Sequence, residues 1–503
     1  MIFEYELRAT LPSLAWCAML PDGVQTVRVE HGAGVTTGPQ GFFEGVWAGD
    51  FAAHDPAGSL AVLGSGAQIA GDDVLFVTPS HILEHLHAVR CKGALYVSNS
   101  LAFLLARTDD GVDPSYKEYH YDAMRISRGH WRESPALRTR SGRRVALWYH
   151  DNARVRADLR VTMEAKAVVP VFRDYAHYTG FLRDIVAAVC ANGRDAGRAR
   201  TYTPLTTISA GYDSPACAVL AREAGCTDAV TITKARPGFA EEDDSGVEIA
   251  NALGLHVRAF DRLGYLTMPD FPEAEFLATA GGGEEVVFAP LAAALDSVIL
   301  FTGYMGDTVW GRTPVRINDV LYMVFPGGSS LGEFRLRTGF AHFPVPCIGY
   351  TRHASIVAVS RSAEMAPWTL GNDYDRPIAR RLVEEQGVPR GAFGRAKMAV
   401  TQVLWQAPDP QEILTPPSYA DLVAFAASIP RFRGAMDRLR FQIMRGVYEG
   451  SRYVDWRLHA LLRRLGFSVP APPWMPERYA FDRGLNALTF HWGVERTLSR
   501  YRR

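Results

Sequence analysis

Cysteine is scarce in this chain of 503 residues, with only six copies. No two of them have the C-x-x-C spacing, which excludes a disulfide scaffold and the usual structural zinc sites. No apolar run reaches the roughly 18 residues of a membrane-spanning helix. The N-terminal MIFEYELRAT also lacks the basic and apolar regions of a signal peptide. We therefore expect a cytoplasmic protein with no membrane partner.

A bias toward either charge is missing as well. Lys and Arg total 54, and Asp and Glu total 54, so the formal net charge is zero. This balance gives no electrostatic reason to expect a nucleic-acid partner. Hydrophobic residues make up 48% of the chain, which excludes a mostly disordered protein. At about 150 residues per domain, the length predicts roughly three domains.

Three regions differ in their sequence pattern. Residues 1–165 contain short strand-like runs between Gly-rich turns, with helices predicted at 80–87 and 98–106, and this pattern indicates an α+β domain with antiparallel sheet. Residues 166–430 open with an amphipathic helix over 178–190 and then alternate strands with helices. Residues 431–503 are predicted to be a helical, Arg-rich extension.

The alternation in the second region is regular. Strands are predicted at 205–209, 229–233, 256–260 and 297–302, and helices at 215–224 and at 245–253, where Ser245 would cap the helix. Strands that alternate with helices form βαβ units and a mostly parallel sheet. We therefore expect an α/β fold for this region.

A tight turn joins the first of these strands to its helix in the run TTISAGYDSP. A strand-to-helix turn aims free backbone N–H groups and the positive end of the helix at one point, which suits a phosphate. A carboxylate there suits Mg²⁺ that bridges phosphates. The alternative is an ordinary turn whose Asp and Ser cap the helix. The candidate nucleotide-binding residues are Ser209, Ala210, Gly211, Tyr212, Asp213 and Ser214.

The run S-A-G-Y-D-S resembles the S-G-G-x-D-S pyrophosphate loop of the asparagine synthetase superfamily of ATP pyrophosphatases, with Ala210 in place of a Gly. The family's second loop resembles Thr302–Asp307, although Thr308 replaces its Glu. The resemblance implies a doubly wound parallel sheet of the adenine nucleotide α-hydrolase-like type, with ATP and Mg²⁺ as cofactors. It also implies that Thr233 and Gly303 contact the nucleotide, and that Asp213 and Asp307 bind Mg²⁺. By default, Asp307 alone would be a turn residue.

A third match covers residues 368–400, which are similar to the family's C-terminal stretch. Lys397 stands where the family has a Lys, and this position implies that it neutralises charge on the leaving pyrophosphate. The alternative is a solvated surface Lys.

The N-terminal region departs from the glutamine-dependent members of the family. Those members carry a nucleophilic Cys directly after the initiator Met, whereas this chain begins Met1-Ile2. An internal thiol such as Cys17 has no free α-amine to act as its base. The resemblance therefore implies a degenerate N-terminal-nucleophile domain in a glutaminase-inactive branch. That branch is similar to β-lactam synthetases and lasso-peptide cyclases, which join an amine already present in the substrate.

Tyr304 lies three residues before Asp307, in the spacing T-G-Y-x-x-D of β-lactam synthetases. The resemblance implies that Tyr304, partnered by a Glu, removes a proton from the attacking amine. Glu333 and Glu364 are the candidate partners. The alternative is a Tyr used for packing or as a substrate platform.

These features together predict an ATP-dependent amide synthetase that adenylates a carboxylate and releases AMP and pyrophosphate. Its partners would be small-molecule or peptide acids and amines, and a homodimer stays open. The alternatives are a catalytically weakened nucleotide-binding or scaffold relative, an amidotransferase that uses free ammonia, and a sulfur- or nitrogen-transferring enzyme. The G-x-S-x-G run at 328–332 is disfavoured as a hydrolase elbow, because no helix is predicted after its Ser.

Overall fold

A computed structural model places most of the chain. It describes residues 1–116, 119–124, 136–234, 245–279, 282–314, 328–372, 374–394, 400–402, 410–428 and 483–502, together with positions 317, 319, 443, 446 and 450. Lys397 and most of the predicted C-terminal extension lie outside these ranges. Among the residues described, no helix is long and apolar enough to cross a membrane.

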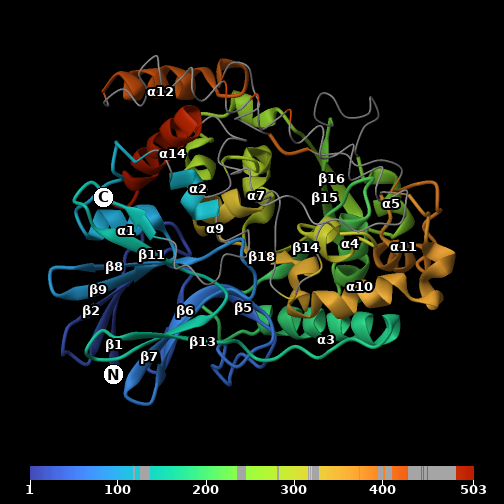
Figure 1. The fold of residues 1–503 in the computed structure, drawn as a ribbon, viewed down its shortest axis with the longest axis horizontal. Helices are drawn as coiled ribbons and strands as arrows, with labels where there is room; N and C mark the ends of the chain where they lie inside the picture. The colour runs from blue at the N-terminus through green and yellow to red at the C-terminus, as the bar shows by residue number, and fades with distance from the viewer. Residues whose placement is uncertain are drawn as a thin grey trace.

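Two sheets packed face to face form the N-terminal part of the fold, at the left of Figure 1. Their pairings are antiparallel apart from β1 with β3, which confirms the predicted α+β pattern. Trp16, Phe42, Phe76 and Trp148 fill the core between the sheets. The first sheet has the order β1 (Ile2–Leu7), β3 (Thr26–His31), β2 (Trp16–Pro21), β9 (Ala94–Ser98), β8 (Leu86–Cys91), β11 (Arg144–Trp148) and β10 (Ala136–Arg138). The second has the order β13 (Val161–Glu164), β12 (Asn152–Val155), β7 (Asp73–Val77), β6 (Val62–Ala70), β5 (Gly41–Trp47) and β4 (Thr36–Gly38).

Two helices were predicted in this part, and one prediction is wrong. The helix near 98–106 is confirmed as α1 (Leu101–Arg107), capped by the Ser100 side chain, and α2 (Tyr119–Met124) follows it. The segment 80–87 is instead a bent loop that leads into β8, which pairs with both β9 and β11. Tertiary strand pairing therefore overrides the local helical pattern.

The second part contains a five-stranded sheet in which every pairing is parallel. Its order is β16 (His256–Asp261), β15 (Asp228–Thr233), β14 (Thr203–Thr207), β17 (Val298–Thr302) and β18 (Ala341–Pro344). The chain starts at β14, moves outward through β15 to β16, and then returns to β17 and β18 on the other side of β14. The predicted parallel α/β sheet is confirmed.

Helices cover both faces of this sheet (Figure 1). One face packs against α3 (Tyr175–Gly193) and α4 (Asp213–Glu223), with α10 (His353–Arg361) and α11 (Pro377–Glu384) beyond them. The other face packs against an apolar cluster that includes Phe276, Val287, Leu291 and Phe334. That cluster is built by α6 (Ala274–Leu277), the 3₁₀ helix η3 (Val286–Leu291), α7 (Ala292–Leu295) and α9 (Gly332–Thr338). The remaining short helices include α5 (Val247–Ala252) and α8 (Gly306–Val309).

The described end of the chain is helical and joins the two parts. Helix α14 (Arg483–Leu498) contacts α1 on the N-terminal side and α6 on the side of the parallel sheet, and α12 (Pro416–Ser428) packs on it. The Tyr501 hydroxyl donates a hydrogen bond to Glu333 at 2.7 Å. The terminal helix thus fixes how the two parts sit against each other.

Candidate functional site

The site predicted from sequence lies where β14 and β17 are neighbours. These strands are parallel and adjacent, and the chain leaves β14 in one direction and returns to β17 from the other. In open α/β sheets such a switch point leaves a crevice at the carboxyl ends of the strands, where ligands bind. The first loop (Ser209–Ser214) follows β14, and the second loop (Gly303–Asp307) follows β17, so both loops meet at this crevice.

The first loop is held by its own serines. The Ser209 and Ser214 hydroxyls lie 2.8 Å apart, and the Gly211 N–H donates to the Ser209 hydroxyl at 3.3 Å. Helix α4 begins at Asp213, so the turn does open a helix as predicted.

Ser245 does not have the predicted position at the start of the next helix. It forms an isolated bridge with Ser209, whereas the following helix begins after Gly246.

The second loop packs directly on Asp213. A Cβ added at Gly303 would lie 2.6 Å from the Asp213 Cβ, and one added at Gly306 would lie 2.2 Å from its carboxyl carbon. Only glycine fits at such distances, so the two glycines allow the loops to touch. Met305 between them has a left-handed backbone with φ of 73°. Asp307 stands in the first turn of α8 and is exposed.

A buried arginine that the sequence analysis missed contacts the first loop. Arg376, only 6% exposed, forms an ion pair with Asp213, although 163 positions separate them. Burial alone would lower the pKa of the guanidinium, but the charges of Asp213 and Asp307 outweigh it and raise that pKa. Both predicted metal-binding carboxylates thus act on one guanidinium. Arg376 lies within residues 368–400, the stretch similar to the family's C-terminal part, but that similarity singled out Lys397 and not this arginine.

Tyr212 points away from the crevice and into the protein. Its ring is fully buried, and its hydroxyl accepts a hydrogen bond from Arg380 at 2.6 Å. Gly394 contacts the same ring, and its N–H donates to the Ala210 carbonyl at 2.8 Å. The Tyr212 side chain therefore fastens the first loop to α11. Lys397, three positions after Gly394, lies outside the described residues.

Tyr304 has a carboxylate partner, but it is neither of the two expected. Burial raises the pKa of the Tyr304 phenol well above its usual value, and the Glu285 and Glu284 carboxylates raise it further, with Glu285 hydrogen-bonded to the phenol. Burial also raises the pKa of Glu285, which accepts hydrogen bonds from the Gly328 N–H and from Ser330.

The other expected residues have structural partners. Glu333 accepts from the Ser100 and Tyr501 hydroxyls, while Glu364 accepts from the Tyr175 N–H and pairs with Arg381. A helix, α9, does follow the G-x-S-x-G run, contrary to the prediction. Its serine is fully buried against Glu285, so the run still gives no exposed nucleophile.

Thr233 lies at the carboxyl end of β15, one strand away from the first loop, and its hydroxyl donates to the Phe260 carbonyl at 3.2 Å. The structure thus gathers the first loop, Gly303 and Asp307 around Asp213 and places Thr233 along the same edge. Tyr304 follows the same strand as Gly303, but its ring packs on His342, with centroids 5.6 Å apart.

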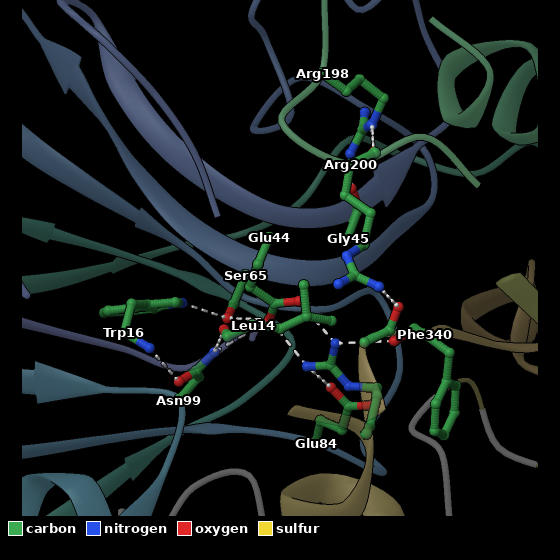
Figure 2. A network of polar contacts seen from close by, with 12 residues as sticks. Leu14, Trp16, Glu44, Gly45, Ser65, Glu84, Asn99, Arg198, Arg200 and Phe340 are labelled. Carbon is green, nitrogen blue, oxygen red and sulfur yellow. Dashed lines mark hydrogen bonds and ion pairs between the residues drawn. The ribbon is translucent and has the colours of Figure 1, made fainter. Parts of the chain in front are cut away.

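The N-terminal sandwich holds Ile2 at its surface and Cys17 in its interior. Strand β1 is the edge strand of its sheet, and Ile2 is 59% exposed there. Burial, and then the Glu30 charge, raise the pKa of the internal Cys17 thiol. The interior contains ion pairs instead, as Figure 2 shows around Glu44. Arg335 from α9 pairs with Glu44 at 2.7 Å and with Glu84 at 2.9 Å.

The donor set at the crevice fits Mg²⁺ only together with a nucleotide. Within the described ranges, no group of three or more His, Cys, Asp or Glu side chains is arranged to hold a metal. Mg²⁺ is usually bound through one or two carboxylates plus substrate phosphates and water, which is the set that Asp213, Asp307 and ATP would provide.

A scan against protein-family models and a search of curated proteins both returned no match for this chain.

Proposed function

We propose that this protein is an ATP-dependent amide synthetase that adenylates a carboxylate and joins it to a substrate amine, releasing AMP and pyrophosphate. One observation carries the proposal: at the switch point of the sheet, the loop after β17 packs on Asp213 of the loop after the neighbouring parallel strand β14. The choice of reaction, adenylation with release of pyrophosphate, comes from the resemblance of these loops to the asparagine synthetase superfamily. Glutamine is not a nitrogen source in this account.

In this proposal the first loop binds the phosphates of ATP. Helix α4 begins in this loop, and the positive end of a helix favours an anion. Asp213 and Asp307 would hold Mg²⁺, which when bound supplies positive charge next to the reacting phosphate. Lys397 would add charge next to the leaving pyrophosphate.

Tyr304 and Glu285 would then activate the amine. Because its pKa is raised, the Tyr304 phenol stays protonated and donates a hydrogen bond to the Glu285 carboxylate. As the phenol oxygen takes a proton from the attacking amine, its own proton passes to Glu285, whose raised pKa makes it a better acceptor than an exposed carboxylate. The pair thus moves one proton without forming a lasting phenolate.

A second candidate function is a nucleotide-binding relative with weakened catalysis. The ion pair between Arg376 and Asp213 favours it, because a guanidinium on a metal-binding carboxylate competes with the metal. Thr308 in place of the family's Glu points in the same direction. An amidotransferase that uses free ammonia would share the site and differ only in its amine.

The proposal is tested by isotope exchange between pyrophosphate and ATP, measured across a panel of candidate acids. An acid-dependent exchange is expected, and Asp213→Asn or Asp307→Asn should slow it more than about a hundredfold, since each loses metal-borne charge stabilisation. Asp228→Asn is the control, because Asp228 starts β15 at the opposite end of the sheet. Formation of ADP and phosphate in place of AMP and pyrophosphate would contradict the proposal.

A further inference from the structure

The negative charge of Asp213 in the first loop is paired with the positive charge of Arg376 in the absence of a nucleotide. Arg376 precedes α11 as its N-cap residue and places a buried guanidinium on the Asp213 carboxylate. The Tyr374 and Tyr212 rings lie beside that guanidinium, with centroids 4.8 and 5.8 Å from its central carbon. The arginine therefore stands where a cation shared by Asp213 and Asp307 would be needed.

The ion pair joins a buried guanidinium to a half-buried carboxylate, so it is hard to break from one side only. Removing one partner leaves the other charge partly or wholly buried with less compensation, which is unfavourable. A divalent cation that takes Asp213 would strand Arg376, and a phosphate that takes Arg376 would strand Asp213. If both arrive together, each group gains a new partner of opposite charge, and Arg–phosphate pairs are among the strongest charged hydrogen bonds.

Arg376 differs in this respect from the other arginines of the same helix. Arg380 donates to the Tyr212 hydroxyl at 2.6 Å and pairs with Glu384 at 2.8 Å, so it holds the loop in place. Arg381 pairs with Glu385 at 2.8 Å and stacks on Tyr175 and Trp368. Arg376 is the one of these three that contacts a carboxylate of the first loop.

We propose that Arg376 is an exchangeable counter-ion of the nucleotide site. It holds Asp213 in the nucleotide-free protein and moves to the phosphates of ATP when Asp213 passes to the divalent cation. This inference rests on the proposed function, because it takes the crevice to be an ATP site. It predicts that metal and nucleotide each bind weakly alone and strengthen each other's binding by the same factor.

The test measures binding rather than turnover. Mn²⁺ is titrated by electron paramagnetic resonance, first alone and then with the ATP analogue α,β-methylene-ATP, against the wild type and Arg376→Met. Without its guanidinium competitor, the variant should bind Mn²⁺ alone at least about tenfold more tightly than the wild type does. The same variant should bind the analogue at least about tenfold more weakly, because the phosphates lose a cation.

Arg381→Met is the matched control. It removes a guanidinium of the same helix that is also ion-paired and stacked on aromatic rings, but away from the loop, so both affinities should equal those of the wild type. Unchanged or weaker binding of Mn²⁺ to a folded Arg376→Met variant, checked by circular dichroism, would overturn the inference.

A second variant covers the case in which Arg376→Met does not fold. Arg376→Lys keeps the charge on Asp213 but loses the planar fork, so Mn²⁺ affinity should stay within about threefold while analogue affinity falls. Wild-type affinity of this variant for the analogue would contradict the exchange. If the wild type itself fails to bind the analogue with Mn²⁺, the proposed function fails. If it binds and the variants behave like the wild type, only this inference fails.

Discussion

At the scale of single residues, burial raises the pKa values of both Tyr304 and Glu285 and so limits how each can transfer a proton. The sequence suggests that Tyr304 takes a proton from an amine, and in the structure burial and the Glu285 and Glu284 carboxylates raise the pKa of its phenol. A phenol that holds its proton so firmly is a poor base by itself. Paired with Glu285 it passes a proton along, and this is the role that its surroundings allow.

Tyr304→Phe tests this role, because it keeps the ring and removes only the hydroxyl. Pyrophosphate exchange, which reports adenylation, should be spared, while amide formation slows by roughly a hundredfold or more. Glu285→Gln should show the same split. The control is Tyr350→Phe, since the buried Tyr350 hydroxyl has no hydrogen-bond partner among the described residues. Equal losses in both activities would show that Tyr304 serves folding or ATP binding instead.

Gly306 tests the contact between the two loops. In Gly306→Ala the new methyl group would overlap the Asp213 carboxyl group, so the loops must separate. We expect ATP affinity to fall at least about tenfold and stability to drop by about 1–3 kcal/mol. Gly180→Ala is the control, because nothing lies within 4 Å of a Cβ added there in α3. Titration of both variants with ATP and Mg²⁺ checks this, and wild-type affinity in Gly306→Ala would contradict the packing.

At the scale of elements, local pattern predicts much of the parallel sheet and little of its contacts. Strands β15 and β17 are short, mostly apolar runs bounded by turn residues, so their sequences alone reveal them, and β14 and β16 are found because strands and helices alternate along the chain. Residues 80–87 have a helical pattern but enter a strand, because pairing with β9 and β11 is decided far away in the chain. For the same reason, neither Arg376 beside Asp213 nor Glu285 beside Tyr304 was predictable from one sequence.

The contact between Arg335 of α9 and the Glu44 and Glu84 carboxylates of the sandwich makes the stability of the protein depend on pH. Burial, and the neighbouring Glu44 charge, raise the pKa of Glu84 from 4.5 to about 7, in spite of its ion pair with Arg335. The folded protein therefore holds a proton that the unfolded chain releases. The stabilisation is complete below about pH 4.5 and is lost as the pH rises through 7.

Glu84→Gln should remove this dependence. Between pH 5 and pH 8 the wild type should lose up to about 3 kcal/mol more stability than the variant does, as urea unfolding at the two pH values would show. At pH 8 the variant should be the more stable of the two, because Arg335 keeps both of its hydrogen bonds to Glu44, at 2.7 and 2.9 Å. A variant that is less stable at pH 8 would mean that the ion pair outweighs the burial of Glu84.

At the scale of the whole molecule, buried ion pairs join the N-terminal sandwich to the part that contains the parallel sheet. Arg335 reaches from α9 to Glu44 and Glu84 in the sandwich, and α14 contacts both parts. The chain starts on an edge strand, and all six cysteines are buried.

We therefore expect no glutamate to be released from glutamine. The reason is chemical: all six cysteines are buried, and burial raises the pKa of the Cys17 thiol and so keeps it protonated. A coupled glutamate assay, run with and without ATP and Mg²⁺, measures this directly. Release above the buffer blank would show a nucleophile that this account does not contain.

The central claim is that ATP binds at the crevice between β14 and β17. Hydrogen–deuterium exchange with mass spectrometry tests it without any knowledge of the acid or the amine. With Mg²⁺ and α,β-methylene-ATP, the peptides that cover residues 207–214 and 302–309 should exchange more slowly, and Asp213→Asn should abolish that protection. If protection falls elsewhere in the chain, or if these two segments exchange at the same rate with and without the nucleotide, the account is wrong.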